Sequence, residues 1–280
     1  FVWSAAAGDV PVVLDGWDVE WTGTFAEPAD RGKVAILSRF SGTKEVALRN
    51  CRLIGTCIPV FNSHPNVAID ANRGTEDRPL TIENSYIAMT RAATTGPADV
   101  NGALLNYGRG VFRSVGSTYR AVMASSTNAA TFYAAVYLSP PNAGTMAGTL
   151  VNDRFDVTLP AGTVTVGGAT SNEKAAINIQ NTYTTMAVRF VNPSISVDGN
   201  QDSVFAGQGS TYVTVEGLIG CNAAVTFENA PAGSYQVVRG DLAVSGNITA
   251  ANMGGPANPS ASVGLSVVNG SAATFMRSDA

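Results

Sequence analysis

Leu48-Arg-Asn50-Cys-Arg-Leu53 is the stretch that decides the fold, because it recurs along the chain. Each copy has an apolar residue, a spacer, Asn, two further residues and a second apolar residue. The close copies are Ile82-Glu-Asn84-Ser-Tyr-Ile87, Leu150-Val-Asn152-Asp-Arg-Phe155 and Phe190-Val-Asn192-Pro-Ser-Ile195. Two weaker copies have Gly16 and Ser117 in place of Asn. The anchors at 16, 50, 84, 117, 152 and 192 are 34, 34, 33, 35 and 40 residues apart, a period typical of a solenoid.

A second repeat has the same period. Short apolar runs carry Ala in their second position, at 35, 68, 103, 135 and 176, and each Ala precedes the next anchor by 14 to 17 residues. Apolar and polar residues alternate over four to six positions, which is the period of a β-strand. The stripes of a helical repeat are missing.

These patterns predict an all-β fold, a right-handed single-stranded parallel β-helix with coils of about 34 residues, over residues 1–240. At the usual strand spacing, six or so coils make a rod about 30 Å long. The longest anchor spacing predicts that Leu159 to Glu173 protrude as a hairpin or loop from one side of the rod. All three tryptophans, Trp3, Trp17 and Trp21, belong to the first coil, where they predict an N-terminal cap or docking surface.

The recurring Asn residues are expected to form a structural ladder. Asn tolerates the left-handed conformation that a bend requires. Since Leu48 and Asn50 share strand parity, the Asn side chains are expected to point inward and to bond from coil to coil. The predicted members of this ladder are Asn50, Asn84, Asn152 and Asn192.

Composition excludes several functions. The chain has 29 Gly, 14% charged residues and a net charge of -4, without a basic cluster, so we expect no nucleic-acid partner. No apolar run is long enough to cross a membrane, and no spacing indicates a metal or another cofactor. Cys51, Cys57 and Cys221 are interpreted as reduced, buried thiols of a protein folded in a cytosol; a Cys51–Cys57 disulfide is the alternative.

Residues 241–280 are rich in small residues and poor in charge, and we expect an extended C-terminal tail. The stretch from Ala257-Asn-Pro-Ser to Arg277-Ser-Asp279 resembles a segment that recurs in bacteriophage tail-fibre and related virion proteins. Ser245-Gly-Asn-Ile-Thr-Ala250 is similar to fibre repeats in the same family. The family segment is usually internal, so we expect this chain to be a fragment, a cleavage product or the ordered part of something longer. The resemblance implies a virion location in a tail or surface appendage.

Few residues point to catalysis. His64 is the only His and is interpreted as a loop residue. A glycan hydrolase needs two carboxylates held roughly 5–10 Å apart, and the candidate pairs are Asp153 with Asp156 and Glu83 with Asp153. The run Asp198-Gly-Asn-Gln-Asp202 resembles the start of a calcium loop but has Ser where the loop requires Gly. We therefore predict no catalytic residue and no metal site.

Tyr133 and Tyr137 share strand parity. If they face outward they are candidates for stacking on sugar rings; a place in the core or in a subunit interface is the other interpretation. The sequence as a whole predicts a phage tail-fibre or tailspike component for host-surface attachment. Its expected partners are sister chains in a homotrimer, other virion proteins and a host-surface glycan. The alternatives are a tailspike depolymerase and a head-decorating fibre.

Overall fold

The computed structural model describes residues 2–3, 11–22, 35–39, 44–62, 77–91, 100–108, 110–123, 132–138, 145–158, 176–179, 185–198, 205–207, 211–217, 227–228 and 235–238. Within these ranges the chain forms strands and turns, and no helix. None of the described segments is therefore a helix of the length and hydropathy needed to cross a membrane. The loop at 159–173 and the tail at 241–280, with its phage-like segment, lie outside the described residues.

The strands form three sheets, named A, B and C here, of eight, eight and six strands. Sheet A contains β1 (Val2–Trp3), β4 (Ala35–Arg39), β7 (Ile58–Asn62), β10 (Val100–Asn106), β13 (Phe132–Leu138), β16 (Ile177–Ile179), β19 (Phe205–Gly207) and β21 (Phe227–Glu228). Sheet B contains β2 (Val12–Asp15), β5 (Val46–Arg49), β8 (Leu80–Glu83), β11 (Gly110–Val115), β14 (Thr145–Val151), β17 (Thr185–Val191), β20 (Thr211–Glu216) and β22 (Tyr235–Val238). Sheet C contains β3 (Asp18–Trp21), β6 (Arg52–Gly55), β9 (Tyr86–Arg91), β12 (Thr118–Met123), β15 (Arg154–Thr158) and β18 (Ser194–Asp198).

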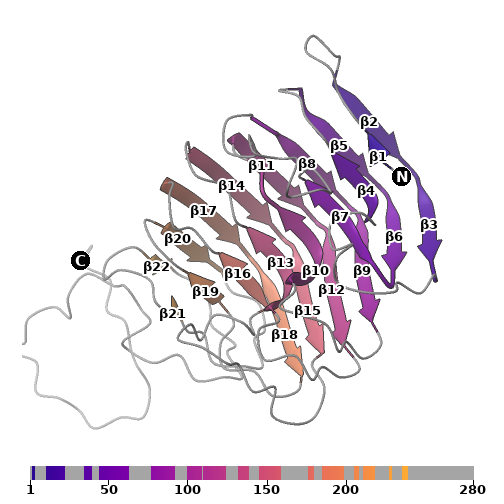
Figure 1. The fold of residues 1–280 in the computed structure, drawn as a ribbon. Coiled ribbons are helices and arrows are strands. Elements are labelled where there is room, and N and C mark those ends of the chain that lie inside the picture. The colour runs from indigo at the N-terminus through magenta and orange to yellow at the C-terminus, as the bar shows by residue number, and fades with distance from the viewer. Residues whose placement is uncertain are drawn as a thin grey trace, which may run out of the picture.

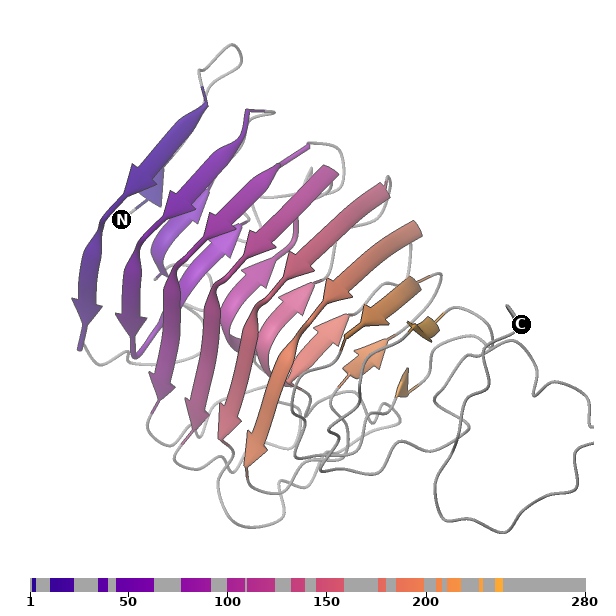
Figure 2. The same ribbon diagram turned by 180° about the vertical axis from the view of Figure 1, so that it is seen from behind.

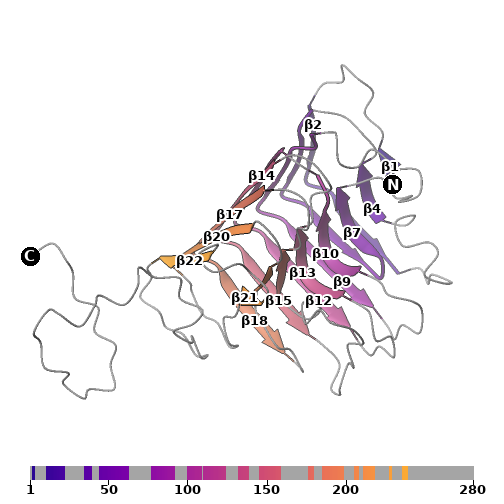
Figure 3. The same ribbon diagram turned by 60° about the vertical axis from the view of Figure 1, so that its left-hand side comes forward.

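Successive strands visit the three sheets in turn, so the chain winds in coils. From β1 to β18 each coil adds one strand to sheets A, B and C, and each strand pairs in parallel with its counterpart in the next coil. Figure 1 shows the coils stacked from the indigo N-terminal strands onward, and Figure 3 shows the walls from another side. This is the arrangement of a parallel β-helix, and the predicted all-β, parallel architecture is confirmed. Eight strands at the usual spacing make a rod about 34 Å long.

The third coil departs from the predicted positions. The Ala68 run was expected to provide its sheet A strand, but that place is taken by β7 (Ile58–Asn62). Only Thr56 and Cys57 separate β6 from β7, so the extra residues of this coil follow the strand instead of preceding it. At the corresponding places in later coils, Ala103, Ala135 and Ala176 are completely buried, which agrees with the second repeat.

The core is a column of apolar side chains, because inward positions stay in register from coil to coil. One row contains Leu48, Ile82, Ser114, Leu150, Phe190 and Val215 on sheet B. A second row contains Leu53, Ile87, Tyr119, Phe155 and Ile195 on sheet C. Inside the column the Tyr119 and Phe155 rings stack with centroids 5.7 Å apart, and Phe155 meets Phe190 edge-on at 6.0 Å. Because inward side chains of successive coils are aligned in rows, each coil covers the apolar side chains of the coils beside it.

A smaller apolar cluster lies on the other side of sheet A. It contains Ile58, Phe61, Leu105, Ala134 and Tyr137, with Tyr107 packed against it. The Tyr107 ring makes edge contacts with Phe61 at 5.4 Å and with Tyr137 at 5.7 Å. Sheet A therefore has apolar side chains packed on both of its faces.

Candidate functional site

A residue with left-handed backbone follows every sheet B strand from β2 to β20. At Asn50, Asn84, Asn152 and Asn192 the φ angles are 52°, 49°, 55° and 51°, which confirms that these residues make the bend. Gly16, Gly116 and Gly217 occupy the same place with φ of 70°, 63° and 60°. The predicted anchor at Ser117 is wrong by one residue, because Gly116 is the one that adopts this conformation. Figure 2 shows the strands of sheet B running into those of sheet C across this short bend.

The Asn side chains point outward, and the predicted inward orientation is wrong. Asn50, Asn84 and Asn152 are exposed, and Asn192 is half-buried. Left-handed backbone interrupts the alternation of a strand, so parity counted from Leu48 fails at the bend. An outer ladder exists in part: Asn192 Nδ2 donates to Asn152 Oδ1 at 3.0 Å, whereas Asn50 Nδ2 donates to Asp15 at 2.9 Å.

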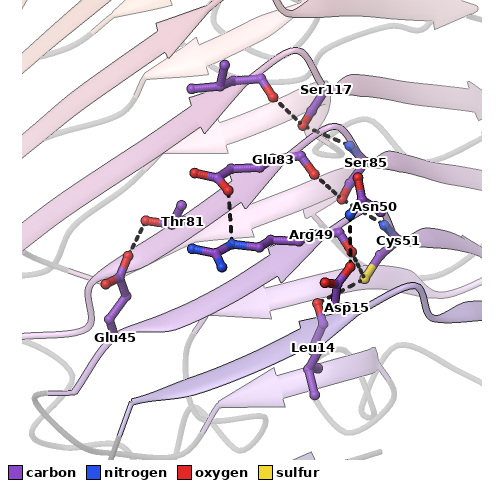
Figure 4. Close-up of polar contacts among 11 residues, drawn as sticks. Leu14, Asp15, Glu45, Arg49, Asn50, Cys51, Thr81, Glu83, Ser85 and Ser117 are labelled. Atoms are coloured by element: carbon purple, nitrogen blue, oxygen red, sulfur yellow. Dashed lines mark hydrogen bonds and ion pairs between the residues drawn. The ribbon is translucent and has the colours of Figure 1, made fainter.

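The residue after the bend points inward and builds a different ladder, which we call the inner corner ladder. It consists of Cys51, Ser85, Ser117 and Asp153, all 1–3% exposed. The N–H of Cys51 donates to Ser85 Oγ at 3.0 Å, that of Ser85 to Ser117 Oγ at 3.1 Å, and that of Ser117 to Asp153 Oδ1 at 2.7 Å. Each Ser hydroxyl donates in turn to the carbonyl two residues earlier (Figure 4). Cys51 and Cys57 are not disulfide-bonded, so the alternative of a Cys51–Cys57 disulfide is wrong.

Asp153 contributes the carboxylic acid of the inner corner ladder. Its Oδ2 is buried without a hydrogen-bond partner. Burial raises the pKa of Asp153 to about 7. The Ser117 N–H and the Ser114 hydroxyl act in the opposite direction and lower this pKa, because they favour the charged form. The Ser114 hydroxyl and the Tyr119 phenol lie 2.6 Å apart, and burial raises the pKa of Tyr119 well above its ordinary value. These groups form a small polar cluster inside the rod.

The structure separates the carboxylates that could have formed a hydrolytic pair. Asp153 points into the rod, whereas Asp156 lies on the outer wall, where both carboxylate oxygens accept from Arg154 Nε at 2.8–2.9 Å. Glu83 also faces outward and pairs with Arg49 at 2.9 Å. Neither predicted pair can flank one glycosidic bond, because the wall of the coil stands between its members.

The outer face of sheet C carries a group of polar side chains. Along the sheet C strands, the second and fourth residues after the bend alternate with the inward row that contains Leu53, Ile87, Tyr119 and Phe155. The surface that we call the sheet C face consists of Arg52, Tyr86, Arg120, Arg154 and Asp156. In strand register, Arg52 lies beside Tyr86, and Arg120 lies beside Asp156. Sequence reasoning missed Tyr86 and Arg120, although counting from the left-handed residue would have found both.

Charge on the walls is arranged in exposed pairs. Arg52 donates to Asp18 at 2.8 Å and to Glu20 at 3.3 Å, and the bond to Asp18 is the main reason that the pKa of Arg52 is raised. Arg189 holds Glu216 with two bonds of 2.7 Å, which raise the pKa of the guanidinium and lower that of the carboxyl. Exposed pairs contribute little to stability, so they mainly define the surface that a partner meets.

The remaining predicted residues fall as follows. Tyr137 is 3% exposed, so it is a packing residue and presents no ring to a sugar on this chain. Tyr133 lies in β13, and its side chain is outside the described part of the structure. His64 and the residues after Asp198 of the calcium-like run also lie outside the described residues. Within the described ranges no group of His, Cys, Asp and Glu is suited to hold a metal ion.

No protein-family model, curated protein or solved structure matches the chain.

Proposed function

We propose that this chain is a structural component of a bacteriophage tail fibre or tailspike, and that it attaches the particle to the host through the sheet C face. In this proposal three chains with right-handed coils associate, and residues 241–280 form the extended tail of the fibre. The observation that carries the proposal is the rod of stacked parallel coils, combined with the phage-like segment between Ala257 and Asp279.

The chemistry of the sheet C face supports a glycan ligand. Tyr86 offers an aromatic ring for stacking, and Arg120 offers donors for sugar hydroxyls. Arg154 and Asp156 add a donor and an acceptor in adjacent positions. Because the groups repeat along the rod at the strand spacing of about 4.8 Å, they suit an extended polymer better than a small molecule.

Attachment is favoured over cleavage by the placement of the carboxylates. The two pairs considered from the sequence have one member inside the rod and one outside. A depolymerase on this chain would have to use a carboxylate pair other than Asp153 with Asp156 or Glu83 with Asp153.

Two experiments test the proposal. Immuno-electron microscopy with antibody against the purified chain is expected to label intact particles; a chain found only in the lysate contradicts a virion role. Sedimentation of the purified protein is expected to give three times the chain mass.

Binding to lipopolysaccharide or capsular polysaccharide from the host strain tests the sheet C face. Arg120→Ala and Tyr86→Ala are each expected to weaken binding about tenfold, as for the loss of one good contact. Arg113→Ala, an exposed arginine on sheet B, is the matched control and is expected to bind normally. Shortening of the polysaccharide during the assay contradicts a purely adhesive role.

A further inference from the structure

The first coil ends the rod with open strand edges. Among the described strands, β2 pairs with β5 alone and β3 pairs with β6 alone. Hydrogen bonds show which backbone groups of the first coil face the second coil. The N–H groups of Val12 and Gly16 donate to the second coil, and the Trp17 carbonyl accepts from the N–H of Arg52. Along a strand, the backbone N–H and C=O groups of successive residues point in opposite directions. The backbone groups of the residues in between therefore point to the open edge. These residues are Val13, Asp15, Asp18 and Glu20.

Inward apolar side chains of the first coil are only partly buried at the same end. In the second coil, Leu48 and Leu53 are 0% and 2% exposed, whereas their counterparts in the first coil, Leu14 and Val19, are only half-buried. Trp17 and Trp21 also occupy inward positions and are 36% and 45% exposed. The indigo strands in Figures 1 and 2 mark this end. An open edge beside exposed apolar side chains is a template for another strand.

The residues that face the indoles in the second coil are small. Trp21 is in register with Gly55, and Trp17 stands at the corner position that Cys51 holds in the next coil. Later coils have Met89, Ala121 and Val157 in the Trp21 row. Large indoles therefore alternate with small side chains at this end, and a unit that covers them needs small inward residues too.

Outward charge alternates between the first three coils. Asp15 is in register with Arg49, and Arg49 is in register with Glu83, with which it pairs. Asp18 and Glu20 likewise face Arg52. The open end thus carries an acidic rim of Asp15, Asp18 and Glu20, and a unit that continued the alternation would present basic residues.

A second copy of this chain fits the acidic rim poorly. At the other end of the rod, sheet C ends at β18 with Ser194 and Ser196 outward. Sheet B ends at β22, where Gln236 and Val238 are in register with Thr214 and Glu216, and none of these residues is basic. Two N-terminal ends facing each other would bring two acidic rims together. Charge complementarity therefore points to a different polypeptide.

We propose that the N-terminal end of the rod, formed by β2 and β3, docks a different polypeptide, which adds two short parallel strands with small residues opposite Trp17 and Trp21 and with Arg or Lys outward. Addition of strands to an open sheet edge is a general mode of recognition. The inference does not depend on the glycan-binding role or on the virion role of the chain.

A synthetic peptide tests the proposal. The probe has the sequence of residues 44–56 with Cys51→Ser, because this segment carries Arg49, Arg52 and the small residue Gly55 in the required places. The control peptide carries Arg49→Glu and Arg52→Glu in addition. The basic peptide is expected to bind the purified protein and to lower acrylamide quenching of tryptophan fluorescence. The acidic peptide is expected to bind at least tenfold more weakly.

The acidic rim is tested on the protein side. Neutralising it with Asp15→Asn, Asp18→Asn and Glu20→Gln is expected to weaken the basic peptide at least tenfold, whereas Glu216→Gln at the other end is expected to change nothing. Should the rim variant fail to fold, a salt titration of the unmodified protein replaces it, and affinity is expected to fall as salt rises. Absence of binding, equal affinity for both peptides, or affinity independent of salt overturns the proposal. Concentration-dependent self-association that protects the tryptophans overturns it in favour of a second copy.

Discussion

The unmodified protein is expected to lose stability as pH rises, because Asp153 ionises inside the inner corner ladder. Replacing Asp153 with Asn is expected to remove this loss. Burial raises the pKa of Asp153 from 3.8 to about 7 in the folded chain. Between these values the folded state binds the extra proton, so the free energy of unfolding falls as pH rises from about 4 to about 7 and is flat above that range. A shift of about three units corresponds to about 4 kcal/mol.

The structure explains why Asn fits. Its Oδ1 can keep the 2.7 Å bond from the Ser117 N–H, and its amide can donate from the position of Asp153 Oδ2, which has no partner. The two Ser residues of the ladder donate to the carbonyl two residues earlier, and Val151 provides that carbonyl here. Because Tyr119 stays neutral over this pH range, the carboxyl of Asp153 is the group that titrates inside the cluster.

The assay is urea unfolding followed by far-ultraviolet circular dichroism at pH 4 to 9, with the variant and the unmodified protein compared at each pH. The free energy of unfolding of Asp153→Asn minus that of the unmodified protein is expected to be near zero at pH 4 and to rise by about 4 kcal/mol by pH 8. Asp156→Asn, on the outer side of the same strand, is the control and is expected to change the free energy of unfolding by less than about 1 kcal/mol at each pH, as for the loss of a surface ion pair. A flat difference for Asp153→Asn would refute the reasoning, because it would mean that the carboxyl ionises normally in the folded chain.

Further substitutions test the corner and the core. Asn84→Ala is expected to lower the free energy of unfolding by about 1–2 kcal/mol, because Ala tolerates left-handed backbone poorly, whereas Asn84→Gly is expected to be nearly neutral in the same urea titration. Gly217→Ala is expected to lower the thermal midpoint, since its Cβ would clash with Asn192 Oδ1; an unchanged midpoint would contradict the described corner. Phe155→Ala removes a fully buried ring and is expected to lower the free energy of unfolding by about 3–5 kcal/mol in urea. Cys51→Ser is expected to stay within about 1 kcal/mol of the unmodified protein, because Ser fills the same place in other coils.

The bend was predictable to a useful degree. Asn50, Asn84, Asn152 and Asn192 were recognised from their period, and their left-handed backbone follows from a local property of Asn. The direction of their side chains was not predictable by counting parity. A single left-handed residue reverses the count, and the sequence does not mark which member of Gly116-Ser117 adopts that conformation.

For the same reason, the candidate sites could be assigned only from the tertiary structure. Asp153 and Asp156 are close in sequence and look like a pair, but the wall of the coil places one inside and one outside. Tyr137 could face either way by periodicity alone, and a second apolar cluster on the other side of sheet A accounts for its burial. Tyr86 and Arg120 come together on one face only because strand register aligns adjacent coils.

The sequence by itself determined that this protein is built of parallel coils, because every coil repeats the same apolar positions and the same residues that tolerate a bend. It also determined roughly where each coil turns. Only the tertiary structure decided which polar side chains are buried and which are exposed, as with Asp153 inside the corner and Asn152 outside it. The physical reason is that a strand alternates strictly, so the side of the wall on which a residue lies depends on the backbone conformation of the bend before it.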